Sequence, residues 1–97
     1  MKVVRSTTFQ NGTIWEKIEV ELDSSDLLPE EQIVPDHAKA QLLELRIDKH
    51  ITMHLLRHGQ LTKDEAAAKI SELDGYRNTL LKLKPAQTLR RRGVGDA

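Results

Sequence analysis

The pair Asn11-Gly12 stands between two β-prone segments near the start of the chain. Both residue types accept the positive φ that a two-residue hairpin turn requires, so the pair is the strongest short-range signal for a β-hairpin. The sequence therefore predicts a hairpin over residues 2–22, and with Asn11 and Gly12 as the loop, Phe9 lies opposite Ile14. Because an isolated hairpin is marginally stable in water, it must pack on a helix or on another sheet.

The expected hairpin has an apolar face and a mixed, mainly polar face, because side chains alternate between the two sides of a strand. The apolar face carries Val3, Phe9, Ile14, Ile18, Val20 and Leu22, of which Phe9, Ile14, Ile18 and Val20 are expected to be core. The opposite face carries Val4, Thr8, Trp15, Lys17 and Glu19. An aromatic side chain among polar neighbours is a candidate contact point, and Trp15 is the only tryptophan in the chain.

Composition limits the kind of protein. With 97 residues and three aromatic side chains, the chain has room for one small domain whose core is built from Leu, Ile, Val and Ala. It contains no cysteine, which excludes disulfides and thiolate metal sites and fits a reducing compartment. No apolar run approaches the ~20 residues of a membrane span, and the early charges at Lys2 and Arg5 do not suit a signal peptide. The sequence thus predicts a soluble cytoplasmic protein without a cofactor.

Two helices are predicted after the hairpin. The first covers residues 36–58, with Asp36 as the N-cap and Gly59 at the left-handed position that ends it. The second opens with a capping box made by Thr62 and Glu65, and Pro85 marks its end. Because so few residues separate the helices, they must run antiparallel as an αα-hairpin.

The predicted fold class is therefore α+β, in the order β-β-α-α. Residues 1–85 form a single domain, and residues 86–97 form a basic flexible tail. A connector of residues 23–35 joins the hairpin to the helices, with Asp26 as the cap of a short helical turn.

The first predicted helix has apolar residues on two sides. One stripe is Ala38, Leu42, Leu45, Met53 and Leu56, and the other is Ala40, Leu43, Ile47, Ile51 and Leu55. A helix of this kind is normally packed between two partners, here the second helix and the hairpin. A second copy would cover what remains exposed of Leu43, Ile47 and Leu55, so we expect a homodimer in which two helical hairpins form a bundle.

Charge is unevenly distributed, although the chain has 15 basic and 15 acidic residues. Acids dominate up to Pro35, whereas the C-terminal end is basic through Arg77, Lys82, Lys84, Arg90, Arg91 and Arg92. A chain with this asymmetry pairs with a second copy or presents its basic end to an acidic partner. The simpler interpretation, solvated faces and a solubilising tail, stays open.

Three histidines recur every fourth residue along the first predicted helix, at His50, His54 and His58. Two histidines at this spacing can bind one metal ion, but the zincin motif needs a glutamate directly after the first histidine, where Ile51 stands. We favour a structural role beside the apolar stripe, so no specific metal site is predicted. A pH-sensitive interface is the remaining alternative.

Nothing in the sequence favours an enzyme. The serines stand outside any G-x-S-x-G context, and the glycines form no phosphate-binding loop. A short chain with few aromatic residues also has little material for a deep pocket. We therefore expect a non-enzymatic protein.

Residues 3–22 contain the pattern T-F-x-N-G-x-x-W-x-K-I-E-V-E-L. This pattern resembles the opening hairpin of short orphan proteins from bacteriophages and other mobile elements, in which a charged helical segment follows. The resemblance covers about a fifth of the chain and carries no catalytic residues. It implies a small accessory protein that acts by binding, for example by blocking a host or defence complex.

Two functional hypotheses follow. In the first, the protein is a binding module that docks on a larger protein assembly through Trp15, Lys17, Glu30 and Glu31, with Phe9 as a further candidate, while Arg90, Arg91 and Arg92 engage an acidic patch. In the alternative, the protein binds nucleic acid through Lys82, Lys84, Arg90, Arg91 and Arg92, which neutralise phosphates.

Overall fold

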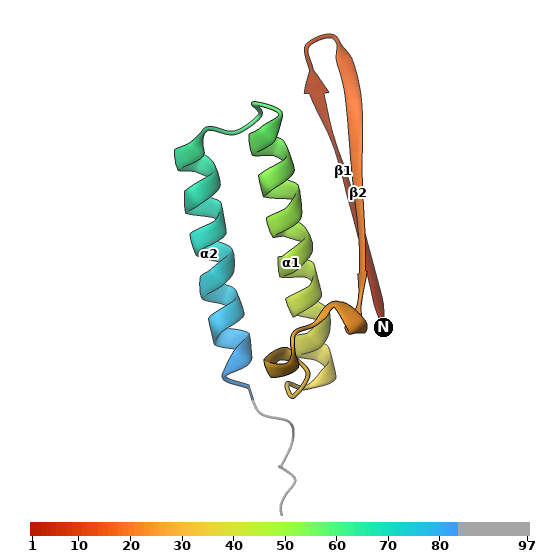
Figure 1. Cartoon of the computed structure of the whole chain (residues 1–97), viewed down its shortest axis with the longest axis vertical. Helices are drawn as coiled ribbons and strands as arrows, with labels where there is room; N and C mark the ends of the chain where they lie inside the picture. The colour runs from red at the N-terminus through yellow and green to blue at the C-terminus, as the bar shows by residue number, and fades with distance from the viewer. Residues whose placement is uncertain (84–97) are drawn as a thin grey trace, which may run out of the picture.

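The computed structural model describes residues 1–83, and within them the elements follow the predicted order (Figure 1). The strands are β1 (Lys2–Asn11) and β2 (Ile14–Asp23), and the helices are α1 (Asp36–Arg57) and α2 (Lys63–Leu81). Two short 3-10 turns, η1 (Ser24–Asp26) and η2 (Pro29–Glu31), lie in the connector. The α+β fold class is therefore confirmed, while the predicted tail of residues 86–97 and the expected stop at Pro85 lie outside the described residues.

Helix α1 is the central layer of the molecule. Figure 1 shows α2 on one side of it and the β-hairpin on the other. Its side chains Leu42, Leu43 and Ile47 are fully buried, which places apolar residues of both predicted stripes in the interior. The prediction of a helix packed between two partners is thus confirmed, and the hairpin gains the support that it cannot provide for itself.

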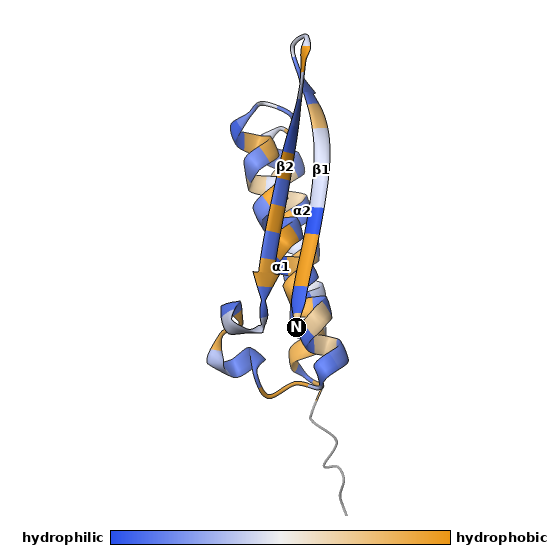
Figure 2. Cartoon of the chain, turned by 90° about the vertical axis from the view of Figure 1, so that its right-hand side faces the viewer, coloured by the Kyte–Doolittle hydropathy of each residue, from blue (hydrophilic) through white to orange (hydrophobic). Residues whose placement is uncertain are grey.

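The hairpin has the predicted faces but a different register. Asn11 pairs with Ile14, so the loop is Gly12-Thr13, and Phe9 lies opposite Glu16 instead of Ile14. Gly12 has a φ of 69° and takes the first loop position, where hairpin turns require positive φ. Because the partner shifts by two residues, every side chain keeps its face. Figure 2 shows the resulting alternation of polar and apolar residues along β2.

Of the two predicted caps of α1, only the C-terminal one is confirmed. Asp36 was expected as the N-cap but is the first helical residue, because the Pro35 carbonyl accepts the N–H groups of Ala38 and Lys39 at 2.9 and 3.0 Å. The C-terminus is as predicted. Gly59 has a φ of 72°, and the bond from the Gln60 N–H to the Leu55 carbonyl at 2.8 Å completes a Schellman motif.

The start of α2 is the predicted capping box. The Glu65 N–H donates to Thr62 Oγ1 at 3.1 Å, and the Thr62 N–H donates to Glu65 Oε1 at 2.9 Å. Two N–H groups that the helix cannot satisfy internally are thereby bonded, which fixes where α2 begins.

The connector contributes to the core. Its apolar side chains Leu27 and Val34 are buried and pack with Ala38, Leu42 and Leu43 of α1. The expected cap at Asp26 is wrong in detail, because Asp23 caps η1 and the Asp26 carboxylate accepts the Asp23 N–H at 2.8 Å. The connector is thus anchored at the N-terminal half of α1.

No helix within residues 1–83 has the length and hydropathy that a membrane span needs.

Candidate functional site

The hairpin tip, defined as residues 11–15, extends beyond the end of α1 (Figure 1). Trp15 is 68% exposed and Ile14 is 64% exposed. Ile14 was expected to be core and is not, because α1 ends at Arg57 and does not reach the inward face of the tip. The tip therefore presents a large apolar side chain on each of its two faces.

A cluster of three rings marks the last point at which α1 supports the hairpin. The Phe9 ring, 7% exposed, lies 5.7 Å from the His54 ring and 5.6 Å from the His58 ring, centroid to centroid. The two imidazoles lie 4.3 Å apart. Phe9 is therefore an anchor of the hairpin and not an exposed contact.

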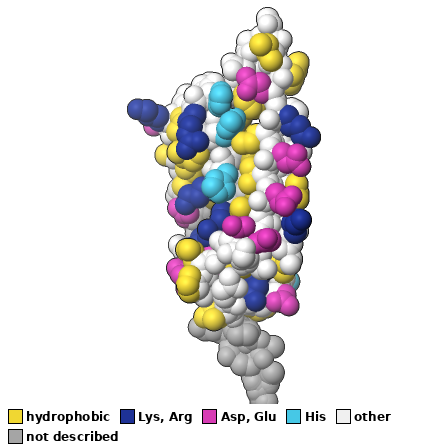
Figure 3. Space-filling model, turned by 45° about the vertical axis from the view of Figure 1, so that its right-hand side comes forward, with side chains coloured by type: hydrophobic (Ala, Val, Ile, Leu, Met, Phe, Trp, Pro, Cys, Tyr) yellow, Lys and Arg dark blue, Asp and Glu magenta, His cyan; other side chains and the backbone are white. Residues whose placement is uncertain are grey.

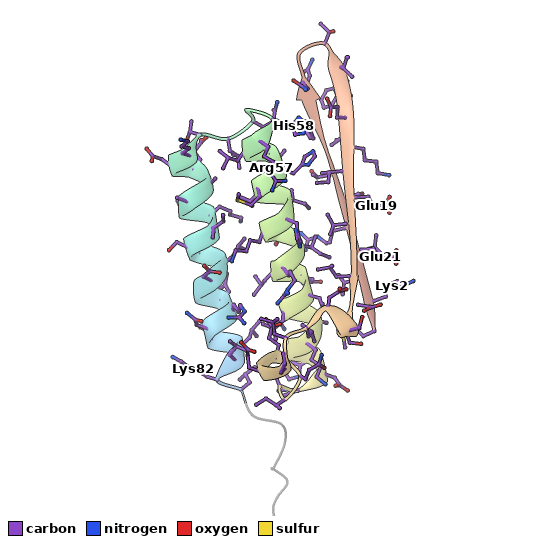
Figure 4. All side chains as sticks on the ribbon, viewed as in Figure 1. Lys2, Glu19, Glu21, Arg57, His58 and Lys82 are labelled. Atoms are coloured by element: carbon purple, nitrogen blue, oxygen red, sulfur yellow. The ribbon has the colours of Figure 1, made fainter. Side chains whose placement is uncertain are left out.

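The outer face of the hairpin is charged below the tip. Figure 4 shows Glu19 and Glu21 pointing away from the helices. Lys2 Nζ lies 3.4 Å from Glu21 Oε2, which forms an exposed ion pair across the two strands. Trp15 and Lys17 are both exposed, as the sequence-derived faces predicted.

Glu31 is the most buried ionisable side chain described, with 1% exposure. Its Oε1 accepts the Leu28 N–H and Arg46 Nη2, both at 2.7 Å, and its Oε2 accepts Arg77 Nε at 2.9 Å. The donors come from the connector, α1 and α2, so one carboxylate joins three segments. The prediction that Glu31 contacts a protein partner is therefore wrong, because its side chain is buried within the chain.

The electrostatics of Glu31 favour its charged form. Burial raises the pKa of the Glu31 carboxyl, but the Leu28 N–H bond, the Arg77 bond and the charges of Arg46 and Arg77 outweigh burial. The net result is a pKa below the ordinary value of 4.5. Its neighbour Glu30 remains exposed, with Oε2 at 3.8 Å from Arg77 Nη2.

A groove of about 580 Å³ runs between α1 and α2. Its apolar lining includes Leu45, Met53 and Leu73, and its basic lining consists of Arg46, Lys49, His50, Arg57 and Arg77. Several of these cations are paired within the chain. Glu31 pairs with Arg46 and Arg77, and we call these three residues the clamp. Lys49 Nζ lies 3.1 Å from Asp74 Oδ1. Figure 3 shows Lys, Arg and His side chains gathered on the face of α1 beside the hairpin.

The sequence reasoning missed this groove. The signal was present in the helical spacing of Arg46, Lys49, Met53 and Arg57, which places them on one side of α1. The prediction placed Met53 in an apolar stripe and considered the three histidines, but it did not include Arg46, Lys49 and Arg57. The structure separates the histidines, because His54 and His58 contact Phe9 whereas His50 lines the groove.

The remaining predicted site residues are only partly described. Lys82 is exposed at the end of α2 (Figure 4), while Lys84, Arg90, Arg91 and Arg92 lie outside the described residues. Among residues 1–83, no group of three or more His, Asp or Glu side chains is placed to hold a metal ion.

No family model, curated protein or solved structure matches the chain in comparisons with known proteins. Among the described residues, the hairpin tip carries the two most exposed large apolar side chains, Trp15 and Ile14.

Proposed function

We propose that the protein is a small non-enzymatic binding module that docks on a larger protein assembly through its hairpin tip. The observation that carries the proposal is the exposure of Trp15 and Ile14 at the end of a hairpin that projects past its supporting helix. Tryptophan is enriched among the residues that dominate binding energy at protein interfaces. Burying Trp15 in a partner's pocket would remove a large apolar side chain from water.

The tip is supported by a rigid base. The strands are paired along their whole length, from Lys2 with Asp23 to Asn11 with Ile14, and Phe9 fixes the hairpin to α1 through His54 and His58. A preformed tip loses little conformational entropy when it binds, so more of the contact energy appears as affinity. This support favours docking over a role for the tip as a flexible loop.

The resemblance of the N-terminal pattern to phage hairpins extends the proposal. It suggests that the partner is a host or defence complex and that docking modulates it. Lys17, exposed on β2 two residues after Trp15, is a proposed polar contact beside the apolar anchor. Glu30 is exposed in the connector, at the opposite end of α1 from the tip (Figure 1), and is a proposed contact of a separate surface. Arg90, Arg91 and Arg92 are proposed to engage an acidic patch.

The alternative is a nucleic-acid-binding accessory. The gathering of Lys, Arg and His on α1 favours it, together with Lys82 and the proposed contacts at Lys84, Arg90, Arg91 and Arg92. Binding of this kind weakens steeply as salt rises, because each neutralised phosphate releases counterions. A salt titration against duplex and single-stranded DNA separates the two functions.

The decisive experiment compares Trp15→Ala with Tyr76→Ala as bait in affinity capture. Tyr76 is an exposed aromatic residue on α2, 56% exposed, and serves as the matched control. We expect Trp15→Ala to lose the partner that the wild-type chain and Tyr76→Ala retain, with circular dichroism unchanged in both. Equal capture by all three proteins would refute docking through the tip, and steeply salt-dependent DNA binding by the wild-type chain would favour the alternative.

A further inference from the structure

The outer edge of β1 is the least protected strand edge in the described chain. The described sheet has two strands, so each strand has one edge without a backbone partner in residues 1–83. Strand β1 carries two charges, Lys2 and Arg5, and none over residues 6–11, whereas β2 carries five, at Glu16, Lys17, Glu19, Glu21 and Asp23. Charged side chains are a common protection against edge pairing, so β2 is protected along its length, whereas β1 is open from Ser6 onward.

We propose that two copies of the chain pair antiparallel through β1, with Ser6 opposite Ser6 of the second copy, to give a four-stranded sheet. A two-fold axis perpendicular to the sheet is the operation that makes two identical edges antiparallel neighbours. Residues directly opposite each other must then share a face, so the axis passes at a residue and not between two residues. The register is therefore defined by one central residue.

Complementarity selects Ser6 as the centre. This register places Val3 opposite Phe9 and Val4 opposite Thr8 of the second copy, so apolar and β-branched side chains meet. A centre at Arg5 would place two arginines directly opposite each other, which is destabilising. A centre at Thr7 would place Arg5 opposite Phe9 and leave Val3 opposite Asn11.

The charges and the helices fit the same arrangement. Arg5 Nη2 lies 3.2 Å from Asp48 Oδ1 of α1, so the axis would bring two arginines and two aspartates together as alternating charges. Adjacent hairpins in one sheet have centres about 10 Å apart, close to the 8–10 Å between packed helices. Ile51 and Leu55 follow Asp48 at helical spacing and are only half-buried, so the neighbouring α1 would cover them.

The β2 edge is the competing interface. The connector leaves the sheet on the β2 side (Figure 2), where it would meet the tip of a second hairpin. The β1 arrangement avoids this contact and leaves Trp15, which lies on β2, free. The inference therefore goes beyond the proposed docking function, and either can fail without the other.

Single cysteines test the register, because the wild-type chain has none. Opposed residues of an antiparallel pair have Cα atoms about 4.5–5.5 Å apart, within disulfide range. We expect Ser6→Cys to form a covalent dimer on mild oxidation. Val4→Cys and Thr8→Cys should each form no covalent dimer alone, because each cysteine lies opposite a residue without a thiol, and the double variant should cross-link. Ready cross-linking of Lys17→Cys on β2, without that of Ser6→Cys, would overturn the proposal.

An independent measurement uses the unmodified chain. Val4 and Thr8 of one strand are about 14 Å apart, too far for a nuclear Overhauser effect, whereas across the proposed interface they are neighbours. In a mixture of isotope-labelled and unlabelled protein, we expect intermolecular effects between the methyl groups of Val4 and Thr8, and sedimentation at the mass of a dimer. A monomer at the same concentration would refute the interface.

Discussion

Replacing Glu31 with glutamine should destabilise the fold far more than any other single carboxylate-to-amide change in the described chain. The substitution keeps the size of the side chain but removes the charge that Arg46 and Arg77 share. It also replaces one acceptor oxygen with an NH₂ group that faces a donor. The connector, α1 and α2 would lose their common contact, because the Leu28 N–H, Arg46 and Arg77 all bond this one carboxylate.

The magnitude follows from burial. Removing one partner of a buried ion pair costs about 3–5 kcal/mol, because the remaining charge is left without compensation. The side chains of Arg46 and Arg77 are 27% and 30% exposed, so water can reach part of each guanidinium after the change. We therefore expect a loss of about 3 kcal/mol at neutral pH, at the lower end of that range.

The pH dependence has a definite sign. The folded-state pKa of Glu31 is lowered from 4.5, so the unfolded chain binds the proton more tightly than the folded one. Stability from the clamp is therefore fully present above pH 4.5 and is lost as pH falls through the lower folded-state value. Other carboxylates titrate in the same window, so the informative quantity is the difference between the wild-type chain and Glu31→Gln.

Urea unfolding followed by circular dichroism, at neutral pH and below pH 4, measures that difference. Glu30→Gln is the matched control, because Glu30 is exposed and its oxygen lies 3.8 Å from the same Arg77. Exposed pairs contribute about 0–1 kcal/mol, so the control should stay close to wild type. The clamp interpretation is refuted if Glu31→Gln costs no more than Glu30→Gln, or if its cost is the same in acid as at neutral pH.

Two further predictions concern the free energy of unfolding, measured with urea. Phe9→Ala should lower it by about 3–5 kcal/mol, because the variant loses the contact with His54 and His58. Trp15→Ala should change it by less than about 0.5 kcal/mol, because the side chain is exposed, and equal losses in the two variants would mean that Trp15 is packed in solution. Thr62→Ala should cost about 1 kcal/mol through the lost cap of α2, and an unchanged unfolding midpoint would show that the capping box contributes nothing.

Much of the fold follows from signals that act within a few residues. Gly12 and Gly59 have the positive φ values that their places in the sequence predicted, and Thr62 and Glu65 bond each other as their spacing predicted. The register of the hairpin was missed by two residues, because alternation fixes the face of each side chain but not its partner. The alternation pattern does not indicate which residue is the last to pair before the turn, so Asn11 could be assigned either to the strand or to the loop.

Properties that depend on distant segments could not be predicted. The alternation pattern of β2 places Ile14 on the apolar face, yet the burial of its side chain depends on how far α1 extends beside the hairpin. Glu31 resembles any other acid of a charged connector, and its partners Arg46 and Arg77 stand 15 and 46 residues away along the chain. The homodimer was expected because Leu43 and Ile47 needed cover, but the single chain already buries both.

Because the single chain buries Leu43 and Ile47, a dimer is expected to form through the sheet and not through the helices. A bundle of two helical hairpins would need an apolar α1 surface that the β-hairpin already occupies, whereas the β1 edge needs only backbone partners. An antiparallel β1 pair would point the two tips in opposite directions, with one Trp15 at each end. Such a dimer gains avidity only for a partner with repeated sites that it can span, because the second contact is then intramolecular. Breaking the β1 interface should therefore weaken capture by a repetitive assembly and leave binding to an isolated subunit unchanged.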